Sequence, residues 1–261
     1  MTSAGEAIRA ALLTGAALAK VKATRALARA WRRGQLVPEF TAPMPDRPAW
    51  PAGLELLPAN RMPKRGSGSP HGTIALWHSL AHIEFVAIDL ALDMAGRFGA
   101  HMGRDFVGDF LSVAADEAMH FALLDRKLHT HGSYYGALPA HAGLWEAAYE
   151  TRHDVAARLA VVPMVLEARG LDVTPGTRDR ISAQGDSRGA LILQRILDDE
   201  IRHVALGAKH FIALCRKVGI QPENHWKTLV ARHFRGTLKP PFNDSARLAA
   251  GLSREFYASV A

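Results

Sequence analysis

The sequence predicts an all-α protein built on four long helices. From Thr73 onward, long stretches carry apolar residues at helical spacing, which is typical of helices that pack against a core. No stretch alternates apolar and polar residues as a half-buried strand would. Glycine and proline, which interrupt helices, gather in a few segments between these stretches. The chain has 261 residues, 48% of them hydrophobic, which is ample material for a core.

The first predicted domain covers residues 1–72. Residues 1–34 are rich in alanine and basic residues and predict one helix closed by Gly34. Residues 35–72 are rich in proline and glycine and predict an irregular arm. Because the arm carries Trp50 and three leucines, we expect it to wrap the body of the protein. The leucines are Leu54, Leu56 and Leu57.

The second predicted domain, residues 73–217, contains the four long helices. We expect them at 73–98, 104–130, 144–169 and 187–217. The turn "GRFGAHMG" separates the first two helices, and "HGSYYGALPAHAG" ends the second. Pro163 predicts a kink in the third helix, "GLDVTPG" a break after it, and "TRDRISAQGD" a short helical or irregular piece. A short first connection and a longer second one favour a four-helix bundle of the crossover type.

Residues 218–261 form the third predicted domain, a C-terminal extension packed on the bundle. The segment "KPPFN" predicts a turn, because consecutive prolines cannot continue a helix. We therefore expect two shorter helices, one on each side of this turn.

The positive charge is concentrated at the N-terminus. The chain has 32 Lys+Arg and 25 Asp+Glu, a net charge of +7. Residues 1–70 hold 11 basic and 4 acidic side chains, which leaves 21 of each in the remainder. A neutral body argues against nucleic-acid binding over the whole surface. For the basic N-terminal helix two interpretations stay open: it packs on its own domain with its cations solvated, or it contacts RNA or an anionic membrane.

Cysteine content and hydropathy exclude several other classes. The single cysteine, Cys215, excludes an internal disulfide framework and a cysteine-based zinc site, and favours the reducing cytoplasm. No run approaches the 18 or so apolar residues of a membrane span, so we expect no transmembrane segment. Glu6 and Arg9 interrupt the first apolar stretch, so we expect no signal peptide.

Two short segments share one pattern of chemistry-bearing residues. "ADEAMH" holds Asp116, Glu117 and His120, and "DDEIRH" places Asp199, Glu200 and His203 at the same relative positions. A glutamate and a histidine three residues apart lie on the same face of a helix and can bind the same cation. One such pair occurs often by chance, whereas two copies that are each preceded by aspartate indicate two halves of one site.

Each copy has a further glutamate on the preceding predicted helix. Glu84 precedes Glu117 by 33 residues, and Glu167 precedes Glu200 by 33 residues. The first pair fits an antiparallel hairpin that brings both carboxylates to the same height. The second interval contains Pro175 and Gly185, so we expect no plain hairpin there.

The predicted surroundings of these acids favour a metal site. At helical spacing, Glu84, Glu117 and Glu200 lie among apolar residues, and a buried unpaired carboxylate costs several kcal/mol or takes up a proton. Metal ions offset that charge, and oxygen and nitrogen donors suit iron first and manganese second. The predicted ligands of two ions are Glu84, Glu117, His120, Glu167, Glu200 and His203. We expect Asp116 and Asp199 to accept hydrogen bonds from the histidine ligands, each from the histidine of the other half.

These motifs carry a family resemblance. The two Glu…Asp-Glu-x-x-His sets resemble the ferritin-like di-iron carboxylate superfamily, and "DEIRH" resembles a signature of bacterial di-iron monooxygenases. The segments "HSLAHIEFVAIDLALD", "FLSVAADEAMHFALL", "LEARGLDVTPG", "LDDEIRHVALG" and "KPPFNDSARLAAG" are similar to a bacterial ferritin-like family catalogued as domain of unknown function 455. The resemblance implies a ferritin-like four-helix bundle with N- and C-terminal helical extensions, and a bound metal pair.

We therefore expect an oxygen-dependent di-iron oxidoreductase, a hydroxylase or oxidase acting on a small organic substrate. It would use O2 as co-substrate and an external electron donor. Manganese, or one ion of each metal, is the alternative cofactor. A ferroxidase or iron-handling protein is the alternative function. A third is an RNA-modifying hydroxylase that uses the basic N-terminus, and a homodimer stays open.

Other polar residues fit structural roles better. We expect His78 and His82 to form hydrogen bonds either with the metal ligands or between helices, and Arg169 and Arg202 to pair with acids of the core. Tyr134, Tyr135 and His141 are expected to form a rim around a pocket that leads to the ligands.

Overall fold

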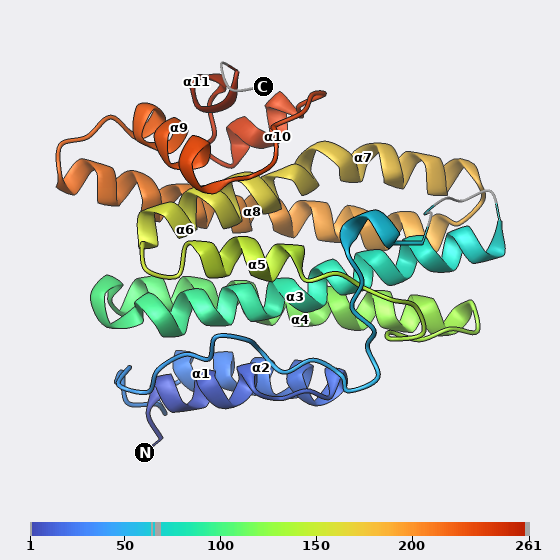
Figure 1. The fold of residues 1–261 in the computed structure, drawn as a ribbon, viewed down its shortest axis with the longest axis horizontal. Helices are drawn as coiled ribbons and strands as arrows, with labels where there is room; N and C mark the ends of the chain where they lie inside the picture. Colours follow the sequence, from blue (N-terminus) through green and yellow to red (C-terminus); the bar gives the residue numbers. More distant parts are fainter. Residues whose placement is uncertain (1, 64, 66–68, 259–261) are drawn as a thin grey trace. The chain divides into compact units, whose positions relative to one another are not determined.

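The computed structural model describes residues 2–63, 65 and 69–258. Within these ranges the chain is helical, and its extended pairings are two isolated bridges, Ser3 with Val37 and Leu56 with Ala140 (Figure 1). The prediction of an all-α protein is confirmed. The chain divides into two compact units, Met1–Trp145 and Glu146–Ala261, and each is described by itself below.

The N-terminal segment forms two helices, so the prediction of a single helix over residues 1–34 is wrong. They are α1 (Ala4–Leu12), capped by the Ser3 hydroxyl, and α2 (Ala17–Arg32). At the bend between them Gly15 lies against the backbone of the arm: a Cβ there would lie 3.1 Å from the carbonyl oxygen of Trp50. The end of α2 is as predicted, because Gly34 has a φ of 67°.

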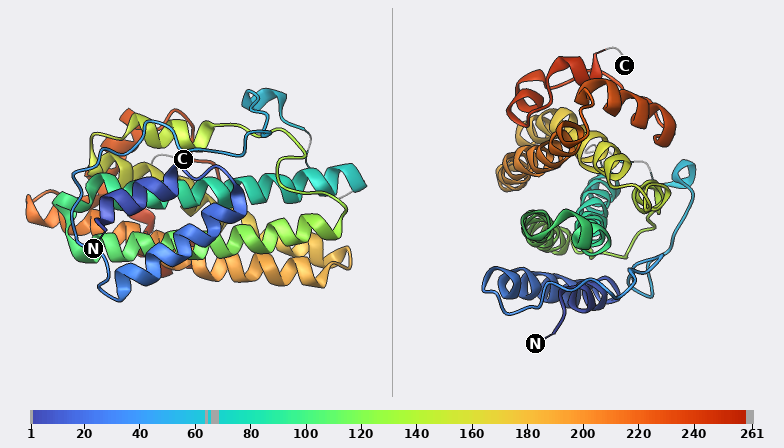
Figure 2. Two further views of the ribbon diagram at one scale, coloured as in Figure 1. Left: turned by 90° about the horizontal axis from the view of Figure 1, so that it is seen from below. Right: turned by 90° about the vertical axis from the view of Figure 1, so that its left-hand side faces the viewer.

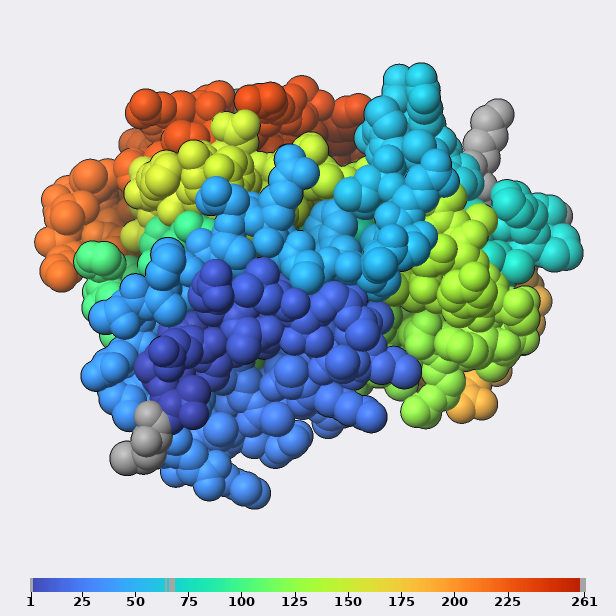
Figure 3. Space-filling view, turned by 60° about the horizontal axis from the view of Figure 1, so that its bottom comes forward, coloured from blue at the N-terminus to red at the C-terminus, as the bar shows by residue number. Residues whose placement is uncertain are grey.

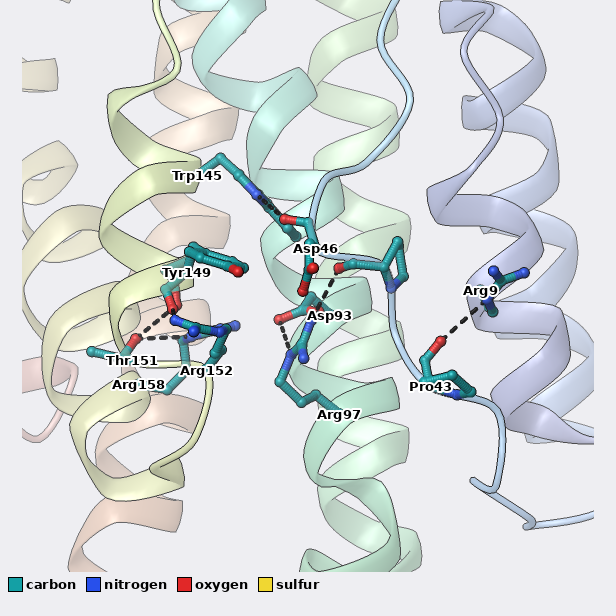
Figure 4. A network of polar contacts seen from close by, with 12 residues as sticks. Arg9, Pro43, Asp46, Asp93, Arg97, Trp145, Tyr149, Thr151, Arg152 and Arg158 are labelled. Carbon is teal, nitrogen blue, oxygen red and sulfur yellow. Dashed lines mark hydrogen bonds and ion pairs between the residues drawn. The ribbon is translucent and has the colours of Figure 1, made fainter.

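The arm packs on the first unit and contains the short 3-10 helix η1 (Ala59–Arg61). Side chains outside the arm donate hydrogen bonds to backbone carbonyl groups of the arm (Figure 4). Arg9 donates to Pro43, Arg97 to Pro45, and the Trp145 indole to Asp46. Residue 64 and the Gly/Ser-rich residues 66–68 of the predicted arm lie outside the described ranges.

The core of the first unit is a hairpin of α3 (Pro70–Met102) and α4 (Arg104–Thr130). The end-on view in Figure 2 shows α1 and α2 as a layer against this hairpin, where α1 packs on α3 and α2 on α4. Of the predicted turn "GRFGAHMG", residues 96–102 belong to α3 instead. Only Gly103, with a φ of 85°, forms the turn. Gly99 lies inside α3, and a Cβ there would lie 2.7 Å from the Phe40 ring and 2.8 Å from the Val107 side chain. That glycine allows close packing rather than ending the helix.

Helix α3 is the one helix of the described residues that is long and apolar enough to cross a membrane by length and composition. However, 78% of the most apolar 18-residue stretch of this helix is buried inside the structure. Its apolar residues form the protein core, as in the central helix of a soluble protein.

The segment predicted as one helix over 144–169 is interrupted. It forms α5 (Gly143–Glu150), α6 (Val155–Val161) and the π-helical turn η2 (Val162–Glu167). Asp154 starts α6 by accepting hydrogen bonds from the amides of Ala156 and Ala157. The break before it is held by Arg158, whose Nε donates to Thr151 Oγ1 at 3.0 Å (Figure 4). Pro163 lies within the π-helical turn rather than at a simple kink.

Helix α7 (Ala168–Ala183) continues through "GLDVTPG" and "TRDRIS", so the predicted break there is wrong. Pro175 lacks an amide N–H and cannot donate to the carbonyl of Leu171, one helical turn earlier. The Asn243 side chain donates to that carbonyl instead, at 3.1 Å. The helix therefore tolerates proline because the C-terminal tail supplies the missing donor.

Helix α8 (Ser187–Lys217) has the predicted bounds and is capped by Asp186. It packs on α7 after a short turn at Gly185, which has a φ of 87°. The second pair of helices is therefore a plain hairpin, contrary to the prediction. Up to residue 258, where the described residues end, the tail forms three helices rather than two, namely α9 (Pro222–His233), α10 (Asp244–Ala249) and α11 (Arg254–Tyr257).

Candidate metal centre

The first hairpin brings three predicted ligands together. Glu84 lies on α3 before the turn at Gly103, and Glu117 lies on α4 after that turn. His120 is one helical turn beyond Glu117. Its Nδ1 lies 3.2 Å from Glu84 Oε2 and 3.2 Å from Glu117 Oε2. All three side chains are buried.

Two carboxyl groups in a buried site oppose each other's ionisation. Burial, followed by the neighbouring charge of Glu117, raises the pKa of Glu84 well above its usual value, and His120 offsets this only in part. A divalent cation would reverse this effect, because it stabilises both carboxylates in the charged form. One ligand atom from each of the three residues can be chosen so that all lie within 4.8 Å of one another. The three residues could therefore hold a metal ion.

The types of donor atom narrow the choice of metal. Two carboxylates and one imidazole offer only oxygen and nitrogen atoms. Iron and manganese bind such donors well, whereas copper(I) and structural zinc sites favour thiolates. The only cysteine, Cys215, is buried on α8, and burial raises the pKa of its thiol, so it is not poised to act as a thiolate ligand.

The second hairpin carries the equivalent residues. Glu167 precedes the turn at Gly185, and Glu200 follows that turn on α8, as Glu84 and Glu117 flank the turn at Gly103. His203 Nδ1 lies 3.6 Å from Glu200 Oε1, and both side chains are buried. Glu167 is half-buried and is the last residue of the π-helical turn η2. Such turns insert one extra residue in a helix and occur often at functional sites.

The two aspartates beside the ligands are half-buried. Asp199 accepts a hydrogen bond at 2.7 Å from Arg195, one helical turn earlier on α8. The predicted hydrogen bonds from the histidine ligands to Asp116 and Asp199 stay predictions.

Within the described residues, two histidines on α3 form hydrogen bonds with the loop after α4, and not with another helix as predicted. The backbone amide of Gly136 donates to His78 Nε2 at 2.9 Å. His82 Nε2 lies 2.9 Å from the carbonyl oxygen of His141, so this nitrogen carries the proton. His82 Nδ1 therefore accepts from the Tyr135 hydroxyl, also at 2.9 Å. Burial lowers the pKa of both histidines to about 4, so they are neutral near pH 7.

The prediction that Tyr134, Tyr135 and His141 together form the rim of a pocket is wrong for the two tyrosines. His141 lines a small, open pocket together with His78, Ser79 and Arg65. Tyr135 is buried against the rings of Phe85 and Phe121, and burial raises the pKa of its hydroxyl. Tyr134 is 59% exposed, and neither tyrosine lines this pocket.

Sequence patterns did not reveal a buried ion pair near this region. Lys20 of α2 pairs with Asp89 of α3, and both side chains are fully buried. The Trp50 indole donates to Asp89 Oδ2 at 2.9 Å, and Lys20 also donates to the carbonyl of Ala49. A lysine in a strongly basic helix looks solvated from sequence alone, and no local signal identifies an acidic partner so distant in the chain.

The fold and these residues define a class: an all-helical protein with a buried Glu/His cluster that could hold a metal ion. Within that class, the chain belongs to the family described as "Protein of unknown function (DUF455)", whose model matches residues 13–258. It is also similar to an "Uncharacterized protein" of Haemophilus influenzae, with 40% identity over 218 residues, 81% of this chain and 76% of that relative. No solved structure matches the chain.

Proposed function

We propose that this protein is an oxygen-dependent oxidoreductase with a pair of iron ions, acting on a small organic substrate. In this proposal, the helices adopt a ferritin-like four-helix bundle. Glu84, Glu117 and His120 supply one set of ligands, and Glu167, Glu200 and His203 supply the other.

One observation carries the proposal: the same ligand pattern lies on two equivalent hairpins. Each set has a glutamate before the turn and Glu-x-x-His after it, with Gly103 at the first turn and Gly185 at the second. In the first set, buried carboxyl groups raise each other's cost of ionisation, which a cation would remove. If the two motifs were only solvent-exposed charged faces of helices, nothing would require the same pattern on both hairpins.

The residues of the chain would hold and shield the metal pair. When held by these residues, a pair of ferrous ions would supply electrons to O2 and would serve as a Lewis acid. Glu84 and Glu117 would bind in the charged form, and His120 as a neutral imidazole. Asp116 and Asp199 would fix the orientation of the two histidine rings by accepting their other N–H.

The overall reaction defines what else must reach the site. Hydroxylation of a C–H bond consumes one O2, two electrons and two protons, and yields an alcohol and one water. The electrons must come from an external donor, such as a reduced flavoprotein or ferredoxin.

Iron uptake under air separates this function from iron storage. Ferrous iron is added anaerobically to the metal-free protein, and then in large excess under air, while oxygen consumption and particle size are followed. We expect about two irons per chain and a single burst of oxygen consumption, as for one dinuclear centre. Sustained turnover with growth of a mineral core would contradict the proposal and favour a ferroxidase.

A matched pair of variants ties the burst to the proposed ligands. Glu117→Ala removes a buried ligand, whereas Glu146→Ala removes an exposed glutamate of α5. We expect the burst to disappear in the first variant and to persist in the second. An unchanged burst in Glu117→Ala would show that oxygen reacts elsewhere.

A further inference from the structure

Helix α2 has an unusual distribution of charge. It contains five basic residues and no acidic residue, and Arg33 follows as its C-terminal cap. Of these six cations, Lys20 is fully buried and paired with Asp89. The remaining five, Lys22, Arg25, Arg29, Arg32 and Arg33, are all exposed.

The exposed cations form one stripe along the helix. With 3.6 residues per turn, their side chains fall within an arc of about 100° and extend over about 16 Å of the helix axis. In the described part of the chain, none of the five forms an ion pair or a hydrogen bond through its side chain. Nothing within the described structure therefore neutralises the stripe.

The opposite face of α2 fixes the stripe in place. Val21, Leu27, Ala28 and Trp31 are buried, and α2 packs on α4. The guanidinium of Arg104 on α4 lies 4.7 Å from the centre of the Trp31 ring. The helix is therefore a rigid support, and its exposed face is available for a partner. In Figure 3 the segment with α1 and α2, in dark blue to blue, lies on the visible face of the first unit.

Two exposed leucines lie close in sequence to the N-terminal end of α2. Leu18 is in line with the cations and is 56% exposed, and Leu13, just before the bend, is 42% exposed. Exposed apolar side chains beside a cluster of cations suit an anionic bilayer, because the leucines can enter the apolar boundary while the cations meet lipid phosphates. The phosphate backbone of a nucleic acid offers no apolar surface for them to cover.

We propose that the exposed face of α2 docks this protein on an anionic lipid bilayer. Lys22, Arg25, Arg29, Arg32 and Arg33 contact the headgroups, and Leu18 and Leu13 enter the boundary of the acyl chains. Binding is peripheral and reversible, because the apolar side of α2 is already used in packing on α4. This role is independent of the proposed oxidoreductase activity.

Vesicle binding by the full-length protein tests the proposal. The probes are vesicles of phosphatidylcholine alone and vesicles with about one third phosphatidylglycerol. We expect binding only to the anionic vesicles, and weaker binding as salt is added, because the stripe acts through charge. Equal binding to both kinds of vesicle, or binding to neither, would overturn the proposal.

Charge-matched variants locate the surface. The triple variant Arg25→Gln, Arg29→Gln, Arg32→Gln should lose about a hundredfold in vesicle affinity, since each cation near an anionic leaflet contributes about fivefold. The control Arg126→Gln, Arg188→Gln, Arg216→Gln removes the same charge from exposed positions outside α2 and should keep its affinity. Equal losses in both variants would mean that only net charge matters and would overturn the assignment.

Two further measurements distinguish the partner. Leu18→Ser should weaken vesicle binding severalfold without changing its salt dependence, because it removes an apolar contact and no charge. Transfer RNA and duplex DNA are the competing ligands. Tighter binding to either than to the anionic vesicles, lost in the α2 triple variant and unaffected by Leu18→Ser, would assign the stripe to nucleic acid and overturn the membrane proposal.

Discussion

Gly207 of α8 lies directly against the ring of Pro163 in the π-helical turn that ends at Glu167. A Cβ at position 207 would lie 2.5 Å from Pro163 Cγ, far inside van der Waals contact. The absence of a side chain at Gly207 therefore lets α8 approach the turn. This contact fixes the backbone just before one of the six proposed ligands.

The first prediction follows from this contact. Gly207→Ala should destabilise the protein by about 1–3 kcal/mol through overpacking, although alanine favours a helix more than glycine does. It should also lower the number of bound irons, because Pro163 must move and Glu167 follows it. Thermal unfolding and metal analysis measure the two effects. Gly170→Ala on α7, where a Cβ would meet no atom within 4 Å, is the control and should be neutral or stabilising. Equal behaviour of the two variants would refute the role given to Gly207.

The second prediction concerns the buried ion pair of Lys20 and Asp89. Lys20→Met should cost about 3 kcal/mol at pH 7, because it leaves the Asp89 carboxylate buried without its cation. Burial already raises the pKa of Asp89 to about 6. Lys20 holds this pKa down, so its removal raises the pKa of Asp89 further, and the cost should shrink as the pH falls from 7 toward 6, where Asp89 of the wild type also takes up a proton. Denaturant unfolding at pH 7 and pH 5 measures it, with exposed Lys22→Met as a control that should change stability little. A cost that is the same at both pH values would contradict this explanation.

The third prediction concerns pH. The unfolded chain protonates His78 near pH 6.5, whereas burial in the folded protein lowers that pKa to about 4. Between these values the unfolded state binds more protons, so the free energy of unfolding falls as pH decreases from about 6.5 to 4. His82 has the same lowered pKa, and Arg65 and His141 are the other ionisable groups lining the pocket beside His78. His78→Gln should lose less stability than the wild type over this range. Parallel stability curves for the two proteins would contradict the prediction.

The fourth prediction concerns the proline inside α7. Asn243→Ala should cost about 1–2 kcal/mol, because it leaves the Leu171 carbonyl without a donor and removes the cap of α10. In a Pro175→Ala background, the new amide can donate to Leu171 and the cost of Asn243→Ala should be smaller. A double-mutant cycle measures the difference, and additive effects would show that the two residues are not coupled.

The sequence predicted helices best where caps and turns are local. The bounds of α4 and α8 agree with the predictions, because Gly103 and Asp186 mark where they start. Prediction failed where distant residues decide the structure. Gly99 resembles a turn residue until Phe40 occupies the space beside it, and Pro175 resembles a break until Asn243 supplies a donor.

The candidate site was predictable in part for the same reason. The repeated spacing of the two motifs identified Glu84, Glu117 and His120, and the structure brings these three together. The π-helical turn that ends at Glu167 and its contact with Gly207 could not be predicted, because they depend on packing between α8 and η2. The hydrogen bonds from His82 to Tyr135 and His141 likewise join residues that are far apart in the chain.

Metal content per chain in two ligand variants tests the central claim most directly. The wild type, Glu117→Ala and Glu200→Ala are loaded anaerobically with ferrous iron, freed of loosely bound metal and analysed for iron and protein. The proposed centre predicts about two irons per chain in the wild type. Each variant should lose at least one of them while keeping its helical circular dichroism spectrum. Full iron occupancy in both variants would contradict the assignment of these residues as metal ligands.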